Sequence, residues 1–287
     1  MRKLVVSYLV TAAALAVSGR PAGAQPPALV QWVANLDLAC YLIPNQPAAN
    51  VPLRLDHLNP LFQWLQLPPE NVVLQSPQDL CVPVYKNGVQ PPADVLPFIQ
   101  WLDWKCYGIT GPSLNLKLQL TNLNPVISRM VGPTVNVTVL DPVQLCVPVL
   151  KSNTSTPPQP PPSVLHLIQN LDVKCYNVAT PNLPPQPITL NHLNPLFSTF
   201  PAVNATIATP RRLCVPVEKN LQAPPADVLC AIQNSDVLCY DLVAPQLNQN
   251  LFLTHLNPVL TGMHLPVENV WVTASDTLCT PVSKALQ

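Results

Sequence analysis

The sequence predicts a mainly β protein built from four tandem, disulfide-stapled modules of about 65 residues each. Three observations lead to this fold class. Short motifs recur four times in the same order, apolar residues alternate with period two inside each copy, and eight of the nine cysteines form equivalent pairs. The repeat therefore sets the frame in which every other feature is interpreted.

The composition excludes several classes of protein. The 287 residues include 38 prolines and only 7 glycines, and 10% of the residues are charged. Disorder requires low hydrophobicity and high net charge, but here 48% of residues are apolar and the formal net charge is zero. Collagen needs glycine at every third position. No dense basic footprint is available for nucleic acid, so no nucleic-acid partner is expected.

The first segment, residues 1–24, reads as a secretory signal peptide. The basic start Arg2-Lys3 precedes the apolar run Leu4–Val17, and the small residues Ala22–Ala24 predict cleavage before Gln25. A membrane anchor is the alternative, but the run is shorter than the ~20 residues that a spanning helix needs. We therefore expect a secreted protein, extracellular or at the cell surface, with no membrane span in the mature chain.

Three markers define the modules and their order. They are Cys-Tyr at 40–41, 106–107, 175–176 and 239–240, Leu-Asn-Pro at 58–60, 123–125, 193–195 and 256–258, and Leu-Cys-x-Pro-Val-x-Lys at 80–86, 145–151, 213–219 and 278–284. The predicted modules are 25–90, 91–151, 163–222 and 223–287, with a proline-rich linker at 152–162. Because proline favours an extended, semi-rigid spacer, we expect two closer pairs, modules one and two and modules three and four, held apart by this linker.

Within a module, alternation predicts two half-buried strands. The first falls at 51–55, 114–120, 188–190 and 251–254, and the second at 71–74, 135–139, 204–208 and 269–273. A short helix is expected at the module start, with Ser163 as the N-cap in module three, followed by a strand at 172–178. The recurrent Asn-Pro predicts a turn, because proline moves the preceding residue out of the helical region.

Eight cysteines form the predicted covalent framework. They pair as Cys40/Cys81, Cys106/Cys146, Cys175/Cys214 and Cys239/Cys279, at separations of 41, 40, 39 and 40 residues. An exported chain meets an oxidising compartment, and a loop of this size contributes roughly 4 kcal/mol in the chain-entropy model. Pairing between neighbouring modules remains the alternative. Close pairs such as C-x-x-C are missing, so no metal site is expected.

Cys230 is left over and is predicted to be unpaired. In an alignment of the modules it stands opposite Gln31, Pro97 and His166, so it is not part of the common framework. Three interpretations stay open: a buried, inert apolar residue, an intermolecular disulfide, and a catalytic thiol.

Histidines and aspartates recur near the markers and could indicate acid–base or metal chemistry. Module two carries Asn122 where the other modules have histidine, and asparagine shares hydrogen bonding with histidine but not proton chemistry. A structural role in the turn therefore explains all four modules, and we expect no catalytic, cofactor-binding or metal site and no cofactor. The residues concerned are His57, His192 and His255, with Asp37, Asp103, Asp172 and Asp236.

Two further recurrent features have structural and functional interpretations. The module-ending lysines are expected to close the last strand, where charge discourages edge pairing. Trp101 and Trp104 could form a sugar-stacking platform, although core packing is the more frequent use of tryptophan. The lysines are Lys86, Lys151, Lys219 and Lys284.

The marker set resembles a bacterial exported repeat module, the domain family of unknown function DUF7450. The best-matching segments are Cys175–Val178 and Leu213–Lys219. The resemblance implies tandem, disulfide-bearing, mainly β units in secreted or surface proteins, and it implies no catalytic residue. His-Leu-Asn-Pro stands where an Asp-Gln-Phe type of turn is expected for that family.

The function expected from the sequence is a secreted, non-enzymatic repeat protein with a binding or structural role outside the cytoplasm. Repetition favours binding, since multiplied weak sites gain avidity whereas catalysis needs one good site. The partner would be a protein or a glycan, and Cys230 could add an intermolecular disulfide. The alternatives are an extracellular hydrolase with a site between modules near His192, His255 or Cys230, and a passive envelope or matrix component.

Overall fold

The structure is a computed structural model that describes residues 27–287, so the predicted signal peptide lies outside the described residues. It is mainly β, as predicted, and its 14 strands belong to one sheet. The strands are β1 (Leu38–Leu42), β2 (Val51–His57), β3 (Glu70–Leu74), β4 (Pro77–Lys86), β5 (Asp103–Gly108), β6 (Leu116–Asn122), β7 (Thr134–Ser152), β8 (Asp172–Ala179), β9 (Gln186–His192), β10 (Val203–Lys219), β11 (Val237–Val243), β12 (Gln249–His255), β13 (Glu268–Val272) and β14 (Ser275–Leu286).

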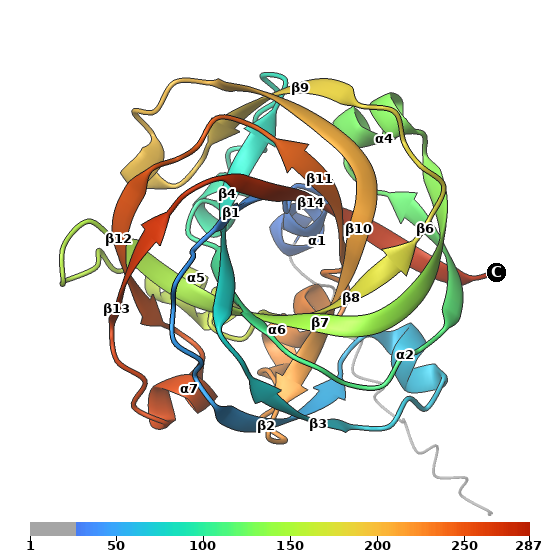
Figure 1. Cartoon of the computed structure of the whole chain (residues 1–287), viewed down its shortest axis with the longest axis horizontal. Helices are drawn as coiled ribbons and strands as arrows, with labels where there is room; N and C mark the ends of the chain where they lie inside the picture. Colours follow the sequence, from blue (N-terminus) through green and yellow to red (C-terminus); the bar gives the residue numbers. More distant parts are fainter. Residues whose placement is uncertain (1–26) are drawn as a thin grey trace, which may run out of the picture.

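Eight of these strands close into an antiparallel ring. Each module contributes two neighbouring strands, and the order around the ring is β1, β4, β5, β7, β8, β10, β11 and β14, with β14 pairing back onto β1. The chain therefore visits the four modules in sequence around a common axis, and Figure 1 looks down this axis. Closure leaves no unpaired edge within the ring itself.

Each module also sends a hairpin outward, and this hairpin pairs with the module opposite in the ring. β2 of module one pairs with β10 of module three, and β9 of module three pairs with β4 of module one. In the same way β6 of module two pairs with β14, and β12 of module four pairs with β7. The second strand of the hairpin is β3, the first part of β7, the first part of β10, or β13. The hairpins occupy four sides of the molecule (Figure 1).

Two sets of short helices complete the modules. The first set begins each module and packs against the inner face of the ring: α1 (Pro27–Ala34), α3 (Leu96–Ile99), α5 (Pro162–Ile168) and α6 (Ala226–Ile232). The second set follows each Leu-Asn dipeptide: α2 (Pro60–Trp64), α4 (Pro125–Val131), the 3₁₀ helix η1 (Pro195–Phe197) and α7 (Pro258–Gly262). No helix in residues 27–287 has the length and apolar character needed to span a bilayer.

Alternation along the ring strands separates an inner core from an outer one. Cys40 and its equivalents face inward, where they pack with the first helix set. The neighbouring Tyr41 and its equivalents face outward, where they pack with the hairpins. The two faces of one ring strand therefore serve two different interfaces, and both are buried.

The four predicted disulfides are present. Cys40–Cys81, Cys106–Cys146, Cys175–Cys214 and Cys239–Cys279 each join the two ring strands of one module. The predicted strands are also found, and each Asn-Pro starts a short helix with the asparagine as N-cap instead of a simple turn.

Two expectations differ from the structure. Modules do not group into two separate pairs, because β7 of module two pairs with β8 of module three as closely as other neighbours do, and the hairpins exchange between opposite modules. Ser163 is not an N-cap, because α5 already begins at Pro162. The N-cap residue is Pro161, which makes no side-chain hydrogen bond to the helix. Proline with its fixed φ is well suited to the first helical position, and it has no N–H that a cap would have to satisfy.

Candidate functional site

The repeated aspartates and lysines form four buried ion pairs. Each aspartate that precedes Cys-Tyr contacts the lysine that ends the same module, and the pairs are Asp37–Lys86, Asp103–Lys151, Asp172–Lys219 and Asp236–Lys284. Lys86 and Lys219 end β4 and β10, as predicted. The predicted role in discouraging edge pairing is wrong, since both are paired with a hairpin strand and Lys86, Lys151 and Lys219 are at most 3% exposed. A partner carboxylate makes burial of the ammonium tolerable.

A third residue from another module completes each cluster. The N-cap asparagine donates its side-chain N–H to the aspartate of the module that precedes its own in the ring. The bonds are Asn124 to Asp37 at 2.8 Å, Asn194 to Asp103 at 3.2 Å, Asn257 to Asp172 at 2.5 Å and Asn59 to Asp236 at 2.7 Å. The Leu-Asn-Pro marker is therefore a joint between neighbouring modules.

Burial controls the protonation of these clusters. Loss of water raises the pKa of Asp103 to about 6 and lowers the pKa of Lys151 to about 8, while the charge of each partner opposes the shift. The pKa of the other three aspartates is raised and that of their lysines is lowered for the same reason. Each carboxylate has both an ammonium and an amide as partners, so the cluster is suited to holding modules together rather than to moving protons.

The tyrosine of each Cys-Tyr meets the residue before Leu-Asn-Pro of the opposite module. The pairs are His57 Nε2 with Tyr176 Oη at 3.1 Å, His192 Nε2 with Tyr41 Oη at 3.5 Å, His255 Nε2 with Tyr107 Oη at 3.0 Å, and Asn122 Oδ1 with Tyr240 Oη at 3.1 Å. Asparagine can replace histidine because only a hydrogen bond to a phenol is needed. The sequence indicated a contact within one turn, whereas the structure shows a contact between modules.

These histidines are neutral near pH 7. Burial, together with the charge of nearby lysines, lowers the pKa of His57 to about 3 and that of His192 to about 4. Burial also lowers the pKa of His255 and raises that of all four tyrosines. A histidine with so low a pKa carries no proton to donate as an imidazolium at neutral pH.

Two of the four tyrosine clefts contain a further ion pair that was not predicted from the sequence. Lys174 contacts Glu70, and Lys105 contacts Glu268. The carboxylates lie beside the phenols, with Tyr176 Oη 3.5 Å from Glu70 and Tyr107 Oη 3.4 Å from Glu268. The pKa of Glu268 is lowered to about 2, because His255 and Lys105 together outweigh the effect of burial.

The sequence contains a signal for these pairs. Lysine precedes Cys-Tyr only in modules two and three, and glutamate starts the second hairpin strand only in modules four and one. Each lysine thus has its glutamate two modules away. The lysine and glutamate positions match only when each module is compared with the module opposite to it in the ring. The exchange of hairpins between opposite modules explains this match.

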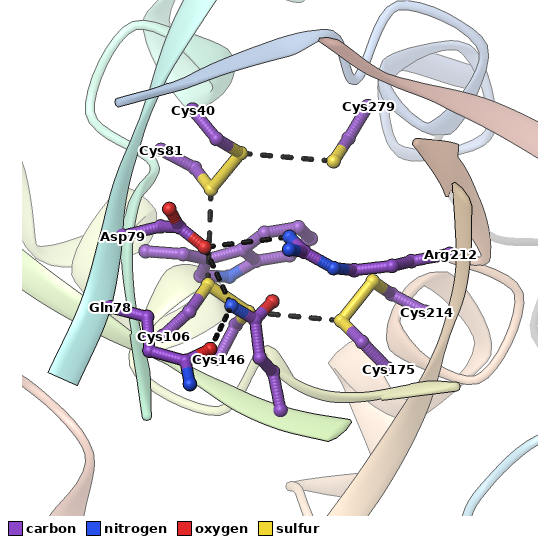
Figure 2. Close-up of a disulfide and its surroundings, with 12 residues drawn as sticks. Cys40, Gln78, Asp79, Cys81, Cys106, Cys146, Cys175, Arg212, Cys214 and Cys279 are labelled. Carbon is purple, nitrogen blue, oxygen red and sulfur yellow. Dashed lines mark hydrogen bonds and ion pairs between the residues drawn. A yellow bond between two sulfur atoms is a disulfide. The ribbon is translucent and has the colours of Figure 1, made fainter. Parts of the chain in front are cut away.

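The inner face of the ring carries a belt of eight sulfur atoms. Neighbouring disulfides touch, with Sγ···Sγ distances of 3.7 Å for Cys40 and Cys279 and 3.8 Å for the other three contacts between modules. Figure 2 shows these contacts except the one between Cys214 and Cys239. The half-cystines are buried to 3% exposure or less. Between modules the cysteines are offset diagonally by two residues in the ladder, whereas Cys40 and Cys81 lie directly opposite. This register favours the pairing within modules over the alternative.

A polar cluster lies two residues from the belt, on the side away from the first helix set. Asp79 Oδ2 accepts from Gln144 at 2.6 Å and lies 3.4 Å from Arg212, which also contacts Asp276 at 2.9 Å. Figure 2 shows Asp79 and Arg212 extending toward each other from opposite sides of the ring. Burial and the charge of Asp276 raise the pKa of Asp79 to about 6. Helices and this cluster thus cover the belt on its two sides.

The remaining candidate residues are not brought together. Cys230 is free and exposed on α6, so the interpretation as a buried residue is wrong, and it lines a cavity of about 540 Å³ with Asn59 and Asn234. Trp104 is buried and its Nε1 donates to Leu171 O at 2.9 Å, which excludes it from a sugar platform. Among residues 27–287 no three metal-ligating side chains are grouped to hold an ion.

The chain has no match among protein-family models, among curated proteins or among solved structures. The resemblance to the exported repeat family therefore stays a prediction.

Proposed function

We propose that the chain is a secreted, non-enzymatic repeat protein with a binding or structural role at the cell surface or outside the cell. The main support for the proposal is that the residues that could perform chemistry have structural roles. The recurrent aspartates and lysines pair within each module, and the recurrent histidines contact tyrosines of the opposite module, so all of them are engaged in contacts inside the fold. Four buried disulfides add to this framework and suit an oxidising compartment.

The surface supports contact with uncharged partners. Six lysines are buried: Lys86, Lys105, Lys151, Lys174, Lys219 and Lys284. Lys117 is the exposed one among the lysines of residues 27–287. Low surface charge reduces long-range steering and leaves shape, amide groups and apolar contacts to select a protein or glycan partner.

The hydrolase alternative is less well supported. His192 and His255 face different tyrosines in different clefts, and Cys230 lies on a helix of the first set. A catalytic pair needs the nucleophile and its base within hydrogen-bonding reach. The passive role remains the second candidate, because a chain stabilised in this way could also serve without a specific ligand.

Two measurements test the proposal. N-terminal sequencing of the protein recovered from outside the cells should begin at Gln25, and recovery only from the cytoplasm would contradict secretion. A glycan and protein array probed with the mature chain should give discrete signals, whereas uniform silence favours the passive role. Turnover of any substrate in a hydrolase panel, lost in a His192→Gln/His255→Gln/Cys230→Ser variant, would refute the non-enzymatic assignment.

A further inference from the structure

Four equivalent clefts surround the ring, each between a hairpin and the tyrosine of the opposite module. One residue at the beginning of the second hairpin strand, its first residue or in module two its second, occupies the same register in all four, opposite Leu55, Leu120, Leu190 or Leu253. These residues are Glu70, Val135, Val203 and Glu268. The molecule therefore presents one site in four versions, and the versions can be compared directly.

Two versions are filled by an ion pair. In one of them the Lys174 ammonium lies 4.7 Å from the Tyr176 ring centroid and contacts Glu70. The loop beside this carboxylate is tightly packed: a Cβ added to Gly111 would lie 2.8 Å from Glu70 Oε2 and 2.9 Å from Pro142 Cγ. Lys105, Glu268 and Tyr107 repeat the arrangement in the second filled cleft.

The other two versions lack both charges. At Tyr41 the lysine position holds Ala39 and the glutamate position holds Val203. A cavity of about 400 Å³ lies there, and Val203 and Tyr41 are in its wall. At Tyr240 the second such cleft carries Val135 and a smaller cavity of about 260 Å³. Loss of the ion pair thus coincides with an open space against the tyrosine.

The chemistry of the larger cavity is aromatic and uncharged. Phe200 lines it and stacks on Phe197 at a centroid distance of 5.0 Å, and His192 lies 6.1 Å from Phe200 in an edge-on arrangement. Val203 and Leu247 add apolar surface. Every residue lining the cavity is uncharged at neutral pH, since the pKa of His192 is lowered to about 4.

One polar group at this cavity has no partner in the fold. His192 is 8% exposed, its Nε2 faces Tyr41, and its buried Nδ1 makes no hydrogen bond. The tautomer with its proton on Nε2 leaves Nδ1 as an acceptor. His57 and His255 also have an unpartnered Nδ1, but a carboxylate occupies their clefts. His57 also lines a cavity, of about 350 Å³, but the carboxylates Asp56 and Glu218 are in its wall. A cavity without charged residues therefore distinguishes His192.

We propose that the cavity at Tyr41 and His192 binds a small uncharged ring compound that carries a hydroxyl group, phenol being the simplest member of the class. The ring would lie against Phe200 and Val203. The hydroxyl would donate to His192 Nδ1, which is buried in the free protein, so binding includes a small movement of the side chains that cover this atom. A volume of about 400 Å³ accommodates such a ring, being within the usual range of roughly 300–1,000 Å³ for ligand sites. The site is independent of the proposed extracellular role, because it depends only on the geometry of the cleft.

The test is titration of the mature protein with phenol by calorimetry and with 4-fluorophenol by ¹⁹F NMR. We expect saturable binding with a Kd on the order of millimolar, as suits so small a ligand. Benzoate and benzylammonium should bind at least tenfold more weakly, because the cavity offers no counter-charge. Absence of saturable phenol binding, or equal binding of benzoate, would overturn the proposal.

The filled clefts supply matched variants that locate the site. Ala39→Lys/Val203→Glu copies the ion pair into the open cleft and should weaken phenol binding at least tenfold. Val203→Phe fills the same space without adding charge and serves if the first variant does not fold, as judged by near-UV circular dichroism. Lys174→Ala/Glu70→Val should open a second site at Tyr176. Unchanged phenol binding in a folded Val203→Phe protein would show that the ligand binds elsewhere and would refute the assignment.

Discussion

At the residue scale, the structure shows polar side chains used as internal joints. Lys151 is a clear example: its ammonium contacts Asp103 and lies 5.0 Å from the Phe197 ring centroid. A buried pair of this kind adds little net stability compared with apolar residues, but removal of one partner leaves an uncompensated charge. The pair lies within module two, and its contacts with Phe197 and Asn194 connect it to module three. These contacts favour one arrangement of the two modules.

Lys151→Met is expected to destabilise the protein by about 3–5 kcal/mol at pH 7, because Asp103 is left without its counter-ion. Urea unfolding followed by circular dichroism measures the change. Lys117→Met, at an exposed lysine, is the control and should alter stability by no more than about 0.5 kcal/mol. Equal effects of the two substitutions would show that the ion pair does not act as described.

The second residue-scale prediction concerns pH and Asp79. Its folded-state pKa, about 6, lies above the unfolded value of 3.8, so the folded protein holds this proton more tightly. The stability that this group contributes is therefore fully present below about pH 3.8 and is lost as the pH rises through about 6. In Asp79→Asn this dependence disappears. Relative to the variant, the wild type should lose on the order of 2–3 kcal/mol between pH 4 and pH 7.

Urea titrations of both proteins across this pH range provide the measurement. Subtraction of the two curves removes the contribution of the other aspartates with raised pKa, such as Asp103. A difference curve that is flat with pH would contradict the assigned pKa.

At the scale of elements, the N-cap asparagines join a helix to a neighbouring module. Asn124 accepts from Val126 N at 2.9 Å and donates to Asp37 at 2.8 Å. The acceptor role is what a helix start requires, and aspartate would fulfil it equally well. The donor role is specific to asparagine, and it connects α4 of module two with the ion pair of module one.

Asn124→Asp is therefore expected to cost about 2–4 kcal/mol at pH 7, although the cap itself is preserved. The new carboxylate would face Asp37 and would remove its donor. Thermal unfolding measures the loss, which should shrink as the pH falls and one carboxyl takes up a proton. Asn182→Asp, at an exposed loop, provides the control with the same change in charge. A loss equal to that of the control would mean that the bond to Asp37 contributes nothing.

Element-level features differ in how far the sequence could predict them. Alternation such as Leu116, Leu118 and Leu120 predicted β6, and the equal cysteine spacing predicted the disulfides. Both signals are local, or are repeated within one module. The burial of Lys86 was not predictable in this way, because lysine is usually exposed. Its partner Asp37 lies 49 residues earlier, and only the fold brings them together.

At the scale of the whole molecule, ring closure and hairpin exchange were beyond the sequence. The four modules carry the same motifs, so the hairpin of module one fits its own module, its neighbour or the opposite module equally well by pattern. The structure selects the opposite one, as the pairing of β2 with β10 shows. The grouping expected from the proline-rich linker was wrong for this reason: its length does not prevent β7 and β8 from pairing.

This architecture predicts the behaviour of a chain cut in the linker. A protease site inserted between Thr154 and Ser155, both exposed, separates the modules into two halves with no disulfide between them. After cleavage the halves should co-elute as one species in size-exclusion chromatography without denaturant, because strand pairs at two ring contacts and four exchanged hairpins join them. Elution as two separate species would support the arrangement in independent pairs instead.

The exchange of hairpins between opposite modules also sets the stoichiometry of the assembly. In an open solenoid each repeat meets only its neighbours, so repeats can be added or lost at the ends. Here the exchange is reciprocal, because the hairpin of module one pairs with module three and the hairpin of module three pairs with module one. Two steps of two modules must therefore return to the starting module, as they do in a closed ring of four. A chain of three or five such modules cannot satisfy that rule, whereas two copies of a two-module chain can. The repeat number is therefore a property of the bonding pattern, and a half-length chain meets the same pattern as a twofold dimer.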